Sequence, residues 1–234
     1  MERIIVTGHR GAAGLEPENT LRSFRRACDL GVDRVETDVH LTRDGHLVCI
    51  HDATVGRTTD GSGPVREMTL AEIRRLDAGQ GERVPTLHEA IETVRGRATL
   101  QIELKAEETP AAVIQVLEET GMTAEEVLIS GFDMGLIQEV QHRKPDLPVS
   151  LLFGDPPSDA LARARSLRAG SLAINLRFIT REWVDEAHQA GLEIRAYNPD
   201  SREEMERVLA LGVDGMGTNR PDLLLDLLRE RGVR

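Results

Sequence analysis

Val35-Glu36-Thr37-Asp38-Val39 is the stretch around which the chain is organised. The side chains of a strand alternate between its two faces, so Glu36 and Asp38 project to one face while the two valines project to the other. Two carboxylates on one face repel each other, which raises one pKa unless a cation lies between them. The stretch therefore predicts a strand that holds a metal ion.

A second apolar run, Leu47-Val48-Cys49-Ile50, follows closely and ends at His51-Asp52. Asp44-Gly45 lies between the two runs, and this dipeptide favours a hairpin turn. We interpret the two runs as a bent hairpin that presents two acids and one imidazole at the mouth of a single site.

Strand-then-helix units recur through the chain, which is typical of parallel β/α folds. The expected strands cover residues 4–9, 34–39, 99–105, 127–132, 149–153, 172–176, 193–197 and 213–218. The expected helices cover residues 21–30, 85–94, 110–120, 134–142, 159–168, 181–190, 202–211 and 221–229. With the arm at 47–51 set aside as a hairpin outgrowth, eight parallel strands remain, and eight strands close a (β/α)8 TIM barrel.

The length of 234 residues is close to the roughly 250 of such a barrel. We expect one catalytic domain over residues 1–234, with an insertion at about 53–84 after the hairpin arm. Within this insertion we expect a short helix over 69–76 and no second core.

The composition excludes several kinds of partner. The formal net charge of −11 argues against nucleic acid and anionic membrane, because both need a basic face. No apolar run approaches the about 18 residues of a membrane span, and Met1-Glu2-Arg3 leads directly into a strand pattern. We expect a cytoplasmic protein without a stable membrane anchor, either a monomer or a homodimer. Cys28 and Cys49 are expected to be buried thiols and not a metal site.

In a β/α barrel the active site lies at the carboxyl ends of the strands. Glu103 and Lys105 are two residues apart on the third strand, so their side chains share a face. Acids at that depth need partners. The polar residues expected at this rim are His9, Arg10, Glu36, Asp38, His51, Glu103, Lys105, Tyr197, Asn198, Thr218 and Asn219.

These residue types predict a division of roles. Three carboxylates suit one hard divalent ion, Mg²⁺ or Ca²⁺ with Mn²⁺ also compatible, because zinc prefers imidazole or thiolate. Arg10 and Lys105 would neutralise an anionic substrate. His9 and His51 remain as an acid/base pair, since an unperturbed pKa near about 6.5 suits proton transfer in either direction. Together the residues predict phosphoester cleavage.

Short motifs along the chain resemble those of the glycerophosphodiester phosphodiesterase family, whose fold is a phospholipase C-like TIM barrel. They occur in that family's order and spacing over essentially the whole chain. Residues 54–79 are similar to the family's insertion after its second histidine. The motifs are His9-Arg10-Gly11, Pro17-Glu18-Asn19-Thr20, Glu36-Thr37-Asp38-Val39, His51-Asp52, Thr59-Asp60-Gly61, Glu103-Leu104-Lys105 and Gly212-Val213-Asp214-Gly215.

The resemblance implies hydrolysis of glycerophosphodiesters, as small-molecule substrates, to glycerol 3-phosphate and an alcohol. It also implies a role for each residue that matches a motif position. These roles are metal ligation by Glu36, Asp38 and Glu103, acid/base catalysis by His9 and His51, and phosphate contact by Arg10 and Lys105.

Two stretches depart from the family pattern. Tyr197-Asn198-Pro199-Asp200 stands where many relatives have Trp-Thr-Val-Asn, and Thr218-Asn219 stands where they usually have Thr-Asp. Tyr197 is expected to pack on the glycerol, and Phe132 at the end of the fourth strand is expected to line the pocket. The departures concern the preferred alcohol and not the reaction.

Other polar residues near the motifs have structural interpretations. His40 continues the face of Glu36 and Asp38 and is expected above the rim. Asn19 or Thr20 is expected to cap the helix at 21–30, and Asp52 either orients a histidine or caps the turn. The histidines expected on the surface are His46, His88, His142 and His188.

Two alternative functions use the same barrel. A lysophospholipid or phosphoinositol phosphodiesterase is disfavoured, because an acyl chain needs an apolar groove. A non-catalytic anion- or metal-binding barrel would lack a catalytic partner, and none is missing. The sequence leaves open the metal, the alcohol, and whether water or the glycerol 2-hydroxyl attacks first. The polar residues of the insertion that disfavour an acyl chain are Thr58, Thr59, Asp60, Ser62 and Arg66.

Overall fold

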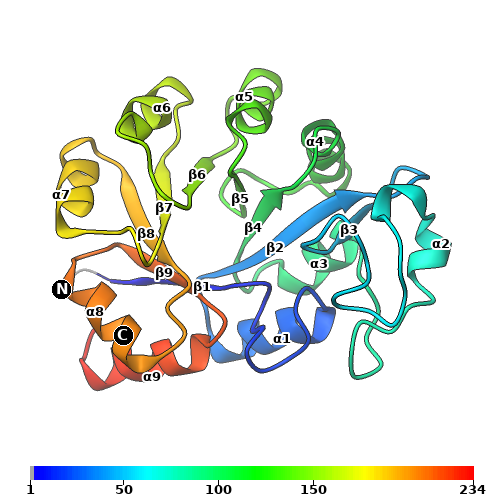
Figure 1. The fold of residues 1–234 in the computed structure, drawn as a ribbon, viewed down its shortest axis with the longest axis horizontal. Helices are drawn as coiled ribbons and strands as arrows, with labels where there is room; N and C mark the ends of the chain where they lie inside the picture. The colour runs from blue at the N-terminus through cyan, green and yellow to red at the C-terminus, as the bar shows by residue number, and fades with distance from the viewer. Residues whose placement is uncertain (1–2) are drawn as a thin grey trace.

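The computed structural model describes residues 3–234, in which eight parallel strands form a closed barrel (Figure 1). The barrel strands are β1 (Ile5–Gly8), β2 (Arg34–Leu41), β4 (Thr99–Leu104), β5 (Val127–Gly131), β6 (Val149–Phe153), β7 (Ser171–Asn175), β8 (Glu193–Tyr197) and β9 (Gly215–Thr218). Closure comes from β1, which pairs in parallel with both β2 and β9. The prediction of a (β/α)8 TIM barrel is confirmed.

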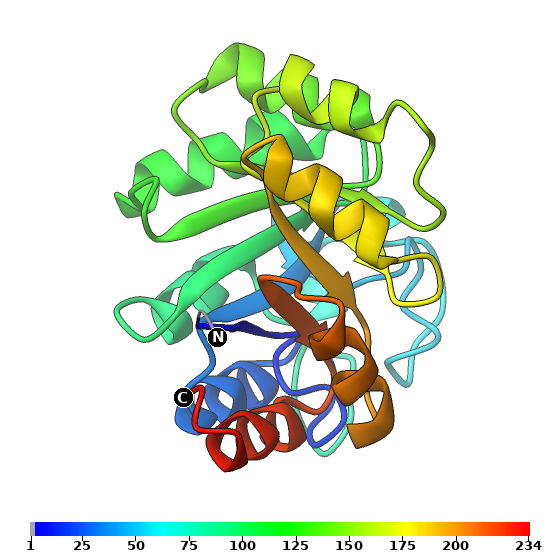
Figure 2. The ribbon, with the colours of Figure 1, turned by 90° about the vertical axis from the view of Figure 1, so that its left-hand side faces the viewer.

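One helix follows each barrel strand and packs on the outside of the barrel (Figure 1 and Figure 2). These helices are α1 (Leu21–Leu30), α3 (Leu87–Val94), α4 (Thr109–Thr120), α5 (Met134–Arg143), α6 (Ala160–Ser166), α7 (Arg181–Gln189), α8 (Arg202–Ala210) and α9 (Pro221–Glu230). Buried aliphatic residues such as Leu100, Ile129 and Ile174 fill the core. Within residues 3–234, no helix is both long enough and apolar enough to cross a bilayer.

The arm after β2 is the strand β3 (Leu47–Cys49), which pairs antiparallel with β2. Gly45 in the connecting turn has a φ of 83°, a conformation that glycine adopts without steric strain. The insertion that follows contains the 3₁₀ helix η1 (Val65–Glu67) and the short helix α2 (Leu70–Ile73). The expectation that it has no core was wrong, because alternate residues of the arm pack against it. The resulting cluster consists of Val48, Ile50, Val55, Val65, Ile73, Ala78 and Val84.

A buried arginine lies inside the barrel below the carboxyl ends of the strands. Arg195 on β8 donates to Gln101 Oε1 at 2.7 Å and to Ser150 Oγ at 2.8 Å. Its Nε lies 3.0 Å from Glu193 Oε1, and Glu193 in turn binds Arg34 at 2.7 Å. Burial lowers the pKa of Arg195 to about 10, and the nearby charge of Arg34 adds to this effect. Barrel interiors are usually filled by branched aliphatic residues, so this polar floor is a distinctive feature of the chain.

Candidate active site

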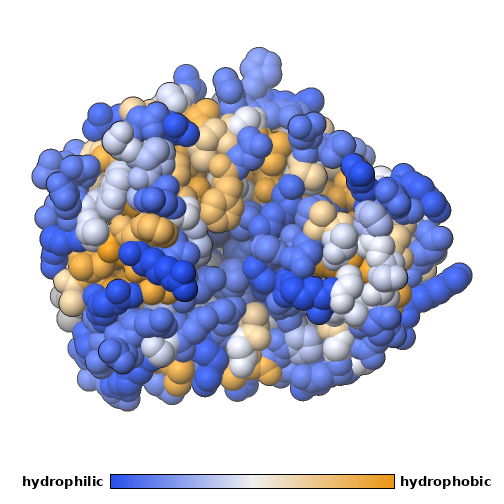
Figure 3. All heavy atoms as spheres, viewed as in Figure 1, coloured by the Kyte–Doolittle hydropathy of each residue, from blue (hydrophilic) through white to orange (hydrophobic). Residues whose placement is uncertain are grey.

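A pocket opens at the carboxyl ends of the barrel strands, as expected. Figure 3 shows this face hollowed at its centre, with hydrophilic residues toward β2 and hydrophobic residues toward β6 and β7. The residues expected at the rim line the pocket except Asp38, Thr218 and Asn219, and Asp38 is fully buried beside Glu36 and Glu103. The lining residues are Thr7, His9, Arg10, Glu36, His51, Gln101, Glu103, Lys105, Phe132, Leu152, Ala173, Arg195, Ala196, Tyr197, Asn198 and Gly217.

Glu36, Asp38 and Glu103 form a buried carboxylate cluster, in which one oxygen from each residue lies within 4.8 Å of the others. The register of β2 with β4 places Asp38 directly opposite Glu103. Burial raises the pKa of Glu36 to about 8 and that of Glu103 to about 7, and the charge of Asp38 contributes to both shifts. Glu36 Oε1 is buried and has no hydrogen-bond partner among residues 3–234. An anionic cluster with such an oxygen fits a hard divalent cation.

Two cationic side chains lie beside the carboxylate cluster. Lys105 Nζ contacts Glu103 and lies 3.1 Å from Asp38 Oδ1. Arg10 Nε lies 3.3 Å from Asp38 Oδ2, and the Arg10 backbone N–H donates to Glu36 Oε2 at 2.8 Å. Burial alone would raise the pKa of Asp38, but Lys105 and Arg10 hold it below its usual value. Asp38 is therefore an anion that anchors two positive charges at the wall of the pocket.

Asn19 supports Asp38 from behind, which corrects its expected role as a helix cap. Its Nδ2 donates to Asp38 Oδ2 at 2.9 Å, and its Oδ1 accepts from Thr37 Oγ1 at 2.8 Å. Its φ of 55° is left-handed, a conformation that asparagine adopts more readily than most residues. Thr20, the other expected cap, is the residue that caps α1, because its side chain accepts from the Ser23 N–H. Both residue types suit a cap, and only the fold shows which one faces the helix.

His9 follows β1 and has one ring nitrogen occupied by a neighbouring side chain. Its Nδ1 lies 2.7 Å from Asn219 Oδ1, beyond the end of β9. Burial lowers the pKa of His9, and the charge of Arg10 lowers it further. The imidazole is therefore neutral at pH values near neutrality. An amide oxygen at Nδ1 selects the tautomer that carries its proton there, which leaves Nε2 as an acceptor.

His51 ends the hairpin arm and is held at two atoms. Its Nδ1 lies 2.6 Å from Asp52 Oδ1, so Asp52 orients the histidine, one of the two roles that the sequence left open. Its carbonyl oxygen lies 3.1 Å from His40 Nε2. His40 lies one residue beyond the last pairing of β2 with β4, as expected for a residue above the rim, and it is buried at this contact. Burial lowers the pKa of His51, although the Asp52 hydrogen bond opposes this shift.

The insertion contributes an arginine, Arg57, that connects the His51 side of the site with the Arg10 side. Arg57 Nε lies 2.7 Å from Asp52 Oδ2, and Arg57 Nη1 lies 2.8 Å from Glu18 Oε2. Glu18 Oε1 in turn accepts from Arg10 Nη1 at 2.8 Å. The Arg57 hydrogen bond, followed by that of His51, holds the pKa of Asp52 far below its usual value. Arg57 therefore keeps Asp52 ionised, a role that no sequence motif indicated.

Two aromatic rings form the opposite wall of the pocket. Phe132 and Tyr197 pack edge to face, with ring centroids 6.1 Å apart and an interplanar angle of 86°. The Tyr197 hydroxyl donates to the Phe153 carbonyl at 2.8 Å. This bond uses its only proton, so Tyr197 presents ring surface to the pocket. Phe132 remains 47% exposed at the mouth.

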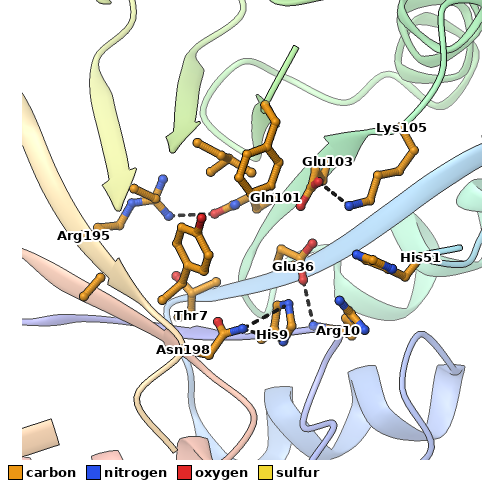
Figure 4. A pocket seen from close by; sticks show the side chains of 16 residues that line it. Thr7, His9, Arg10, Glu36, His51, Gln101, Glu103, Lys105, Arg195 and Asn198 are labelled. Carbon is orange, nitrogen blue, oxygen red and sulfur yellow. Dashed lines mark hydrogen bonds and ion pairs between the residues drawn. The ribbon is translucent and has the colours of Figure 1, made fainter. Parts of the chain in front are cut away.

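Several lining residues were missed by the sequence analysis although their spacing carries a signal. Thr7, Gln101 and Arg195 each lie two residues before a predicted rim residue on the same strand. A period of two places each of them on the interior face, one layer deeper. The close view in Figure 4 shows Gln101 and Arg195 to the left of Glu103, with the imidazole of His9 under Glu36 and that of His51 to its right.

Comparison with known proteins matches residues 9–223 to the glycerophosphoryl diester phosphodiesterase family. The chain belongs to this family. It is therefore a phosphoric diester hydrolase, and the resemblance seen in the sequence motifs is confirmed. The matched residues include all of the site residues described above except Thr7.

Individual members of the glycerophosphoryl diester phosphodiesterase family match over nearly the full length. The glycerophosphodiester phosphodiesterase of Caldanaerobacter subterraneus subsp. tengcongensis is 37% identical over 243 residues, which cover 98% of this chain and 100% of the relative. That of Bacillus subtilis is 30% identical over 250 residues, covering 95% and 85%. A phosphodiesterase of Oleispira antarctica, solved with its product sn-glycerol-3-phosphate, superposes with a TM-score of 0.90 at 30% identity and covers 97% of each chain.

Proposed function

We propose that this chain hydrolyses glycerophosphodiesters to glycerol 3-phosphate and an alcohol, with a divalent cation at the carboxylate cluster. The observation that carries the proposal is the pair of imidazoles on different sides of Glu36, each held through Nδ1 so that Nε2 is available to a substrate. The related Oleispira antarctica phosphodiesterase binds sn-glycerol-3-phosphate as its product, which supports the same product here.

The cation would be held by Glu36, Asp38 and Glu103, whose oxygens and net charge suit Mg²⁺ or Ca²⁺, with Mn²⁺ also compatible. When bound, it would act as a Lewis acid that polarises the phosphoryl group. Arg10 and Lys105 lie beside this cluster and would contact the phosphate oxygens. Phe132 and Tyr197 would pack against the carbon atoms of the glycerol.

The surroundings of the two histidines support a different role for each. His9 is neutral and faces a neutral amide, so its Nε2 accepts the proton of the attacking hydroxyl as a new P–O bond forms. His51 faces the Asp52 carboxylate, which stabilises an imidazolium. Its Nε2–H therefore gives a proton to the departing alcohol oxygen as the old P–O bond breaks. His9 gains one proton in this step and His51 loses one, so the total number of protons on the two histidines is unchanged.

The products of glycerophosphocholine hydrolysis test this proposal. We expect glycerol 3-phosphate and choline in equal amounts when the protein is incubated with the substrate and Mg²⁺ or Ca²⁺. Phosphorus NMR identifies the phosphate product, and a choline assay measures the alcohol. Phosphocholine and glycerol would show cleavage on the other side of the phosphorus and would contradict the proposal.

A lysophospholipid is a second candidate substrate, because two large hydrophobic side chains are exposed among residues 3–234. Phe132 is 47% exposed and Phe178, which follows β7, is 41% exposed. Both lie past the carboxyl ends of barrel strands, Phe132 after β5 and Phe178 after β7. Lysophosphatidylcholine is therefore included in the same assay, and a higher kcat/KM than for glycerophosphocholine would favour this candidate.

The raised pKa values of Glu36 and Glu103 predict how metal-free stability depends on pH. Between the ordinary value of 4.5 and these raised values, the folded protein binds protons that the unfolded chain does not. The free energy of unfolding therefore falls as the pH rises through this range. A cation needs ionised carboxylates, so its stabilising effect should be larger at about pH 8 than at about pH 6. Thermal unfolding with EDTA and with Ca²⁺ at both pH values checks this, and equal shifts would contradict it.

A further inference from the structure

An aspartate outside the pocket lining holds the side chain that faces His9. Asp200 follows β8, and Asn219 follows β9. Asp200 Oδ1 accepts from the Asn219 backbone N–H at 2.8 Å and from Thr218 Oγ1 at 2.9 Å. Asp200 Oδ2 accepts from Asn219 Nδ2 at 2.6 Å. Three donors therefore converge on one carboxylate, and one of them is the Asn219 amide.

These bonds decide which end of the Asn219 amide faces the histidine. Since Nδ2 donates to Asp200, Oδ1 is turned toward His9 Nδ1, 2.7 Å away. An acceptor at that distance requires a proton on Nδ1. Asn198 Nδ2 lies at 3.3 Å from Nδ1 and 3.5 Å from Nε2, too distant and too evenly shared to select a tautomer.

We propose that Asp200 is a positioning residue that acts through Asn219 to keep Nε2 of His9 unprotonated. The inference rests on the proposed role of His9 as general base, because only a base needs a lone pair at Nε2. In this arrangement the Asn219 amide separates the negative charge of Asp200 from the His9 imidazole. His9 therefore has a neutral hydrogen-bond partner, in contrast to His51, whose partner is the Asp52 carboxylate.

The variant D200N tests this relay because the backbone determines how the new amide is oriented. The Asn219 backbone N–H still requires an acceptor, so the introduced side-chain oxygen occupies the place of Oδ1. The introduced NH₂ group then faces Asn219 Nδ2, and the two donors force the Asn219 amide to rotate. Its NH₂ group would then face His9 Nδ1 and select the tautomer with the proton on Nε2. We expect kcat to fall by about 10²- to 10⁴-fold with little change in KM.

The double variant D200N/N219D provides the rescue. The carboxylate introduced at position 219 accepts from the introduced amide at position 200 and also from His9 Nδ1–H, so the original tautomer returns. We expect most of the lost kcat to be recovered. D222N is the matched control, because Asp222 is also an acid of this region but binds Arg220, at 3.0 and 2.7 Å, and should leave kcat unchanged.

Imidazole nitrogen NMR reads the tautomer independently of activity. Wild type and the double variant should show the His9 proton on Nδ1, and D200N should show it on Nε2. An unchanged tautomer in D200N, or a double variant no more active than D200N, would overturn the proposal. If D200N does not fold, N219A removes the same acceptor and should lower kcat with a mixed His9 tautomer. Normal activity in H9A would instead overturn the base assignment, while the NMR comparison would still report on the relay.

Discussion

Alanine at position 9 or 51 is expected to lower kcat for glycerophosphocholine by about 10²- to 10⁴-fold, the range usual for loss of a general acid or base. His9→Ala removes the acceptor for the attacking proton, and His51→Ala removes the donor for the departing alcohol. Both side chains line the pocket and neither belongs to the hydrophobic core, so both variants should remain folded. Steady-state kinetics and thermal unfolding on the same samples check both statements.

The leaving group separates the two histidines. A glycerol 3-phosphate ester of p-nitrophenol releases a far more acidic alcohol, which needs little help from a general acid. His51→Ala should therefore be much less impaired on this ester than on glycerophosphocholine, whereas His9→Ala should be impaired on both. His88→Ala is the control, because His88 is exposed on α3 and pairs with Glu119. The reverse pattern would show that His9 is the acid and His51 the base. Near-normal activity of both variants would contradict both assignments.

Glu36→Gln is expected to abolish cation-dependent turnover, with a loss of about 10³-fold or more, because cation charge stabilisation contributes several kcal/mol. The glutamine carbonyl can still accept from the Arg10 backbone N–H, the bond that Glu36 Oε2 makes at 2.8 Å. Its NH₂ group then takes the place of Oε1, the oxygen without a partner among residues 3–234, and cannot bind a cation. The substitution therefore removes a ligand while it preserves the local fold.

The same variant should be more stable than wild type in the absence of metal. Burial, followed by the repulsion by Asp38, raises the Glu36 pKa to about 8, and removal of the carboxylate relieves both effects. Added Ca²⁺ should raise the unfolding temperature of wild type but not that of E36Q. Glu107→Gln is the control, because Glu107 is exposed in the loop after β4. An E36Q variant that keeps both activity and cation stabilisation would contradict the assignment of Glu36 as a ligand.

The sequence predicted the parts of the site that follow from strand periodicity. Glu36 and Asp38 lie on one face because they are two residues apart, and so do Glu103 and Lys105. Parallel β/α units predicted the barrel, and the barrel predicted that these faces meet at one rim. The register that places Asp38 opposite Glu103 completed the cluster.

Contacts between different loops could not be predicted in the same way. Arg57 reaches Asp52 and Glu18 from an insertion without regular periodicity, and its sequence context resembles that of any surface arginine. Asp200 and Asn219 meet only because β8 and β9 are neighbours in the closed sheet. The sequence has Asn219 where relatives usually have aspartate. The structure shows that the carboxylate of Asp200, in the adjacent loop, binds the amide of Asn219.

Release of glycerol 3-phosphate from glycerophosphocholine by metal-stripped protein, with Mg²⁺, Ca²⁺ or Mn²⁺ added back singly, tests the central claim most directly. We predict negligible release by the stripped protein and restored release with at least one of the three ions. Full activity in the presence of a chelator would contradict the role of the carboxylate cluster. Absence of release with every ion would contradict the proposed substrate class.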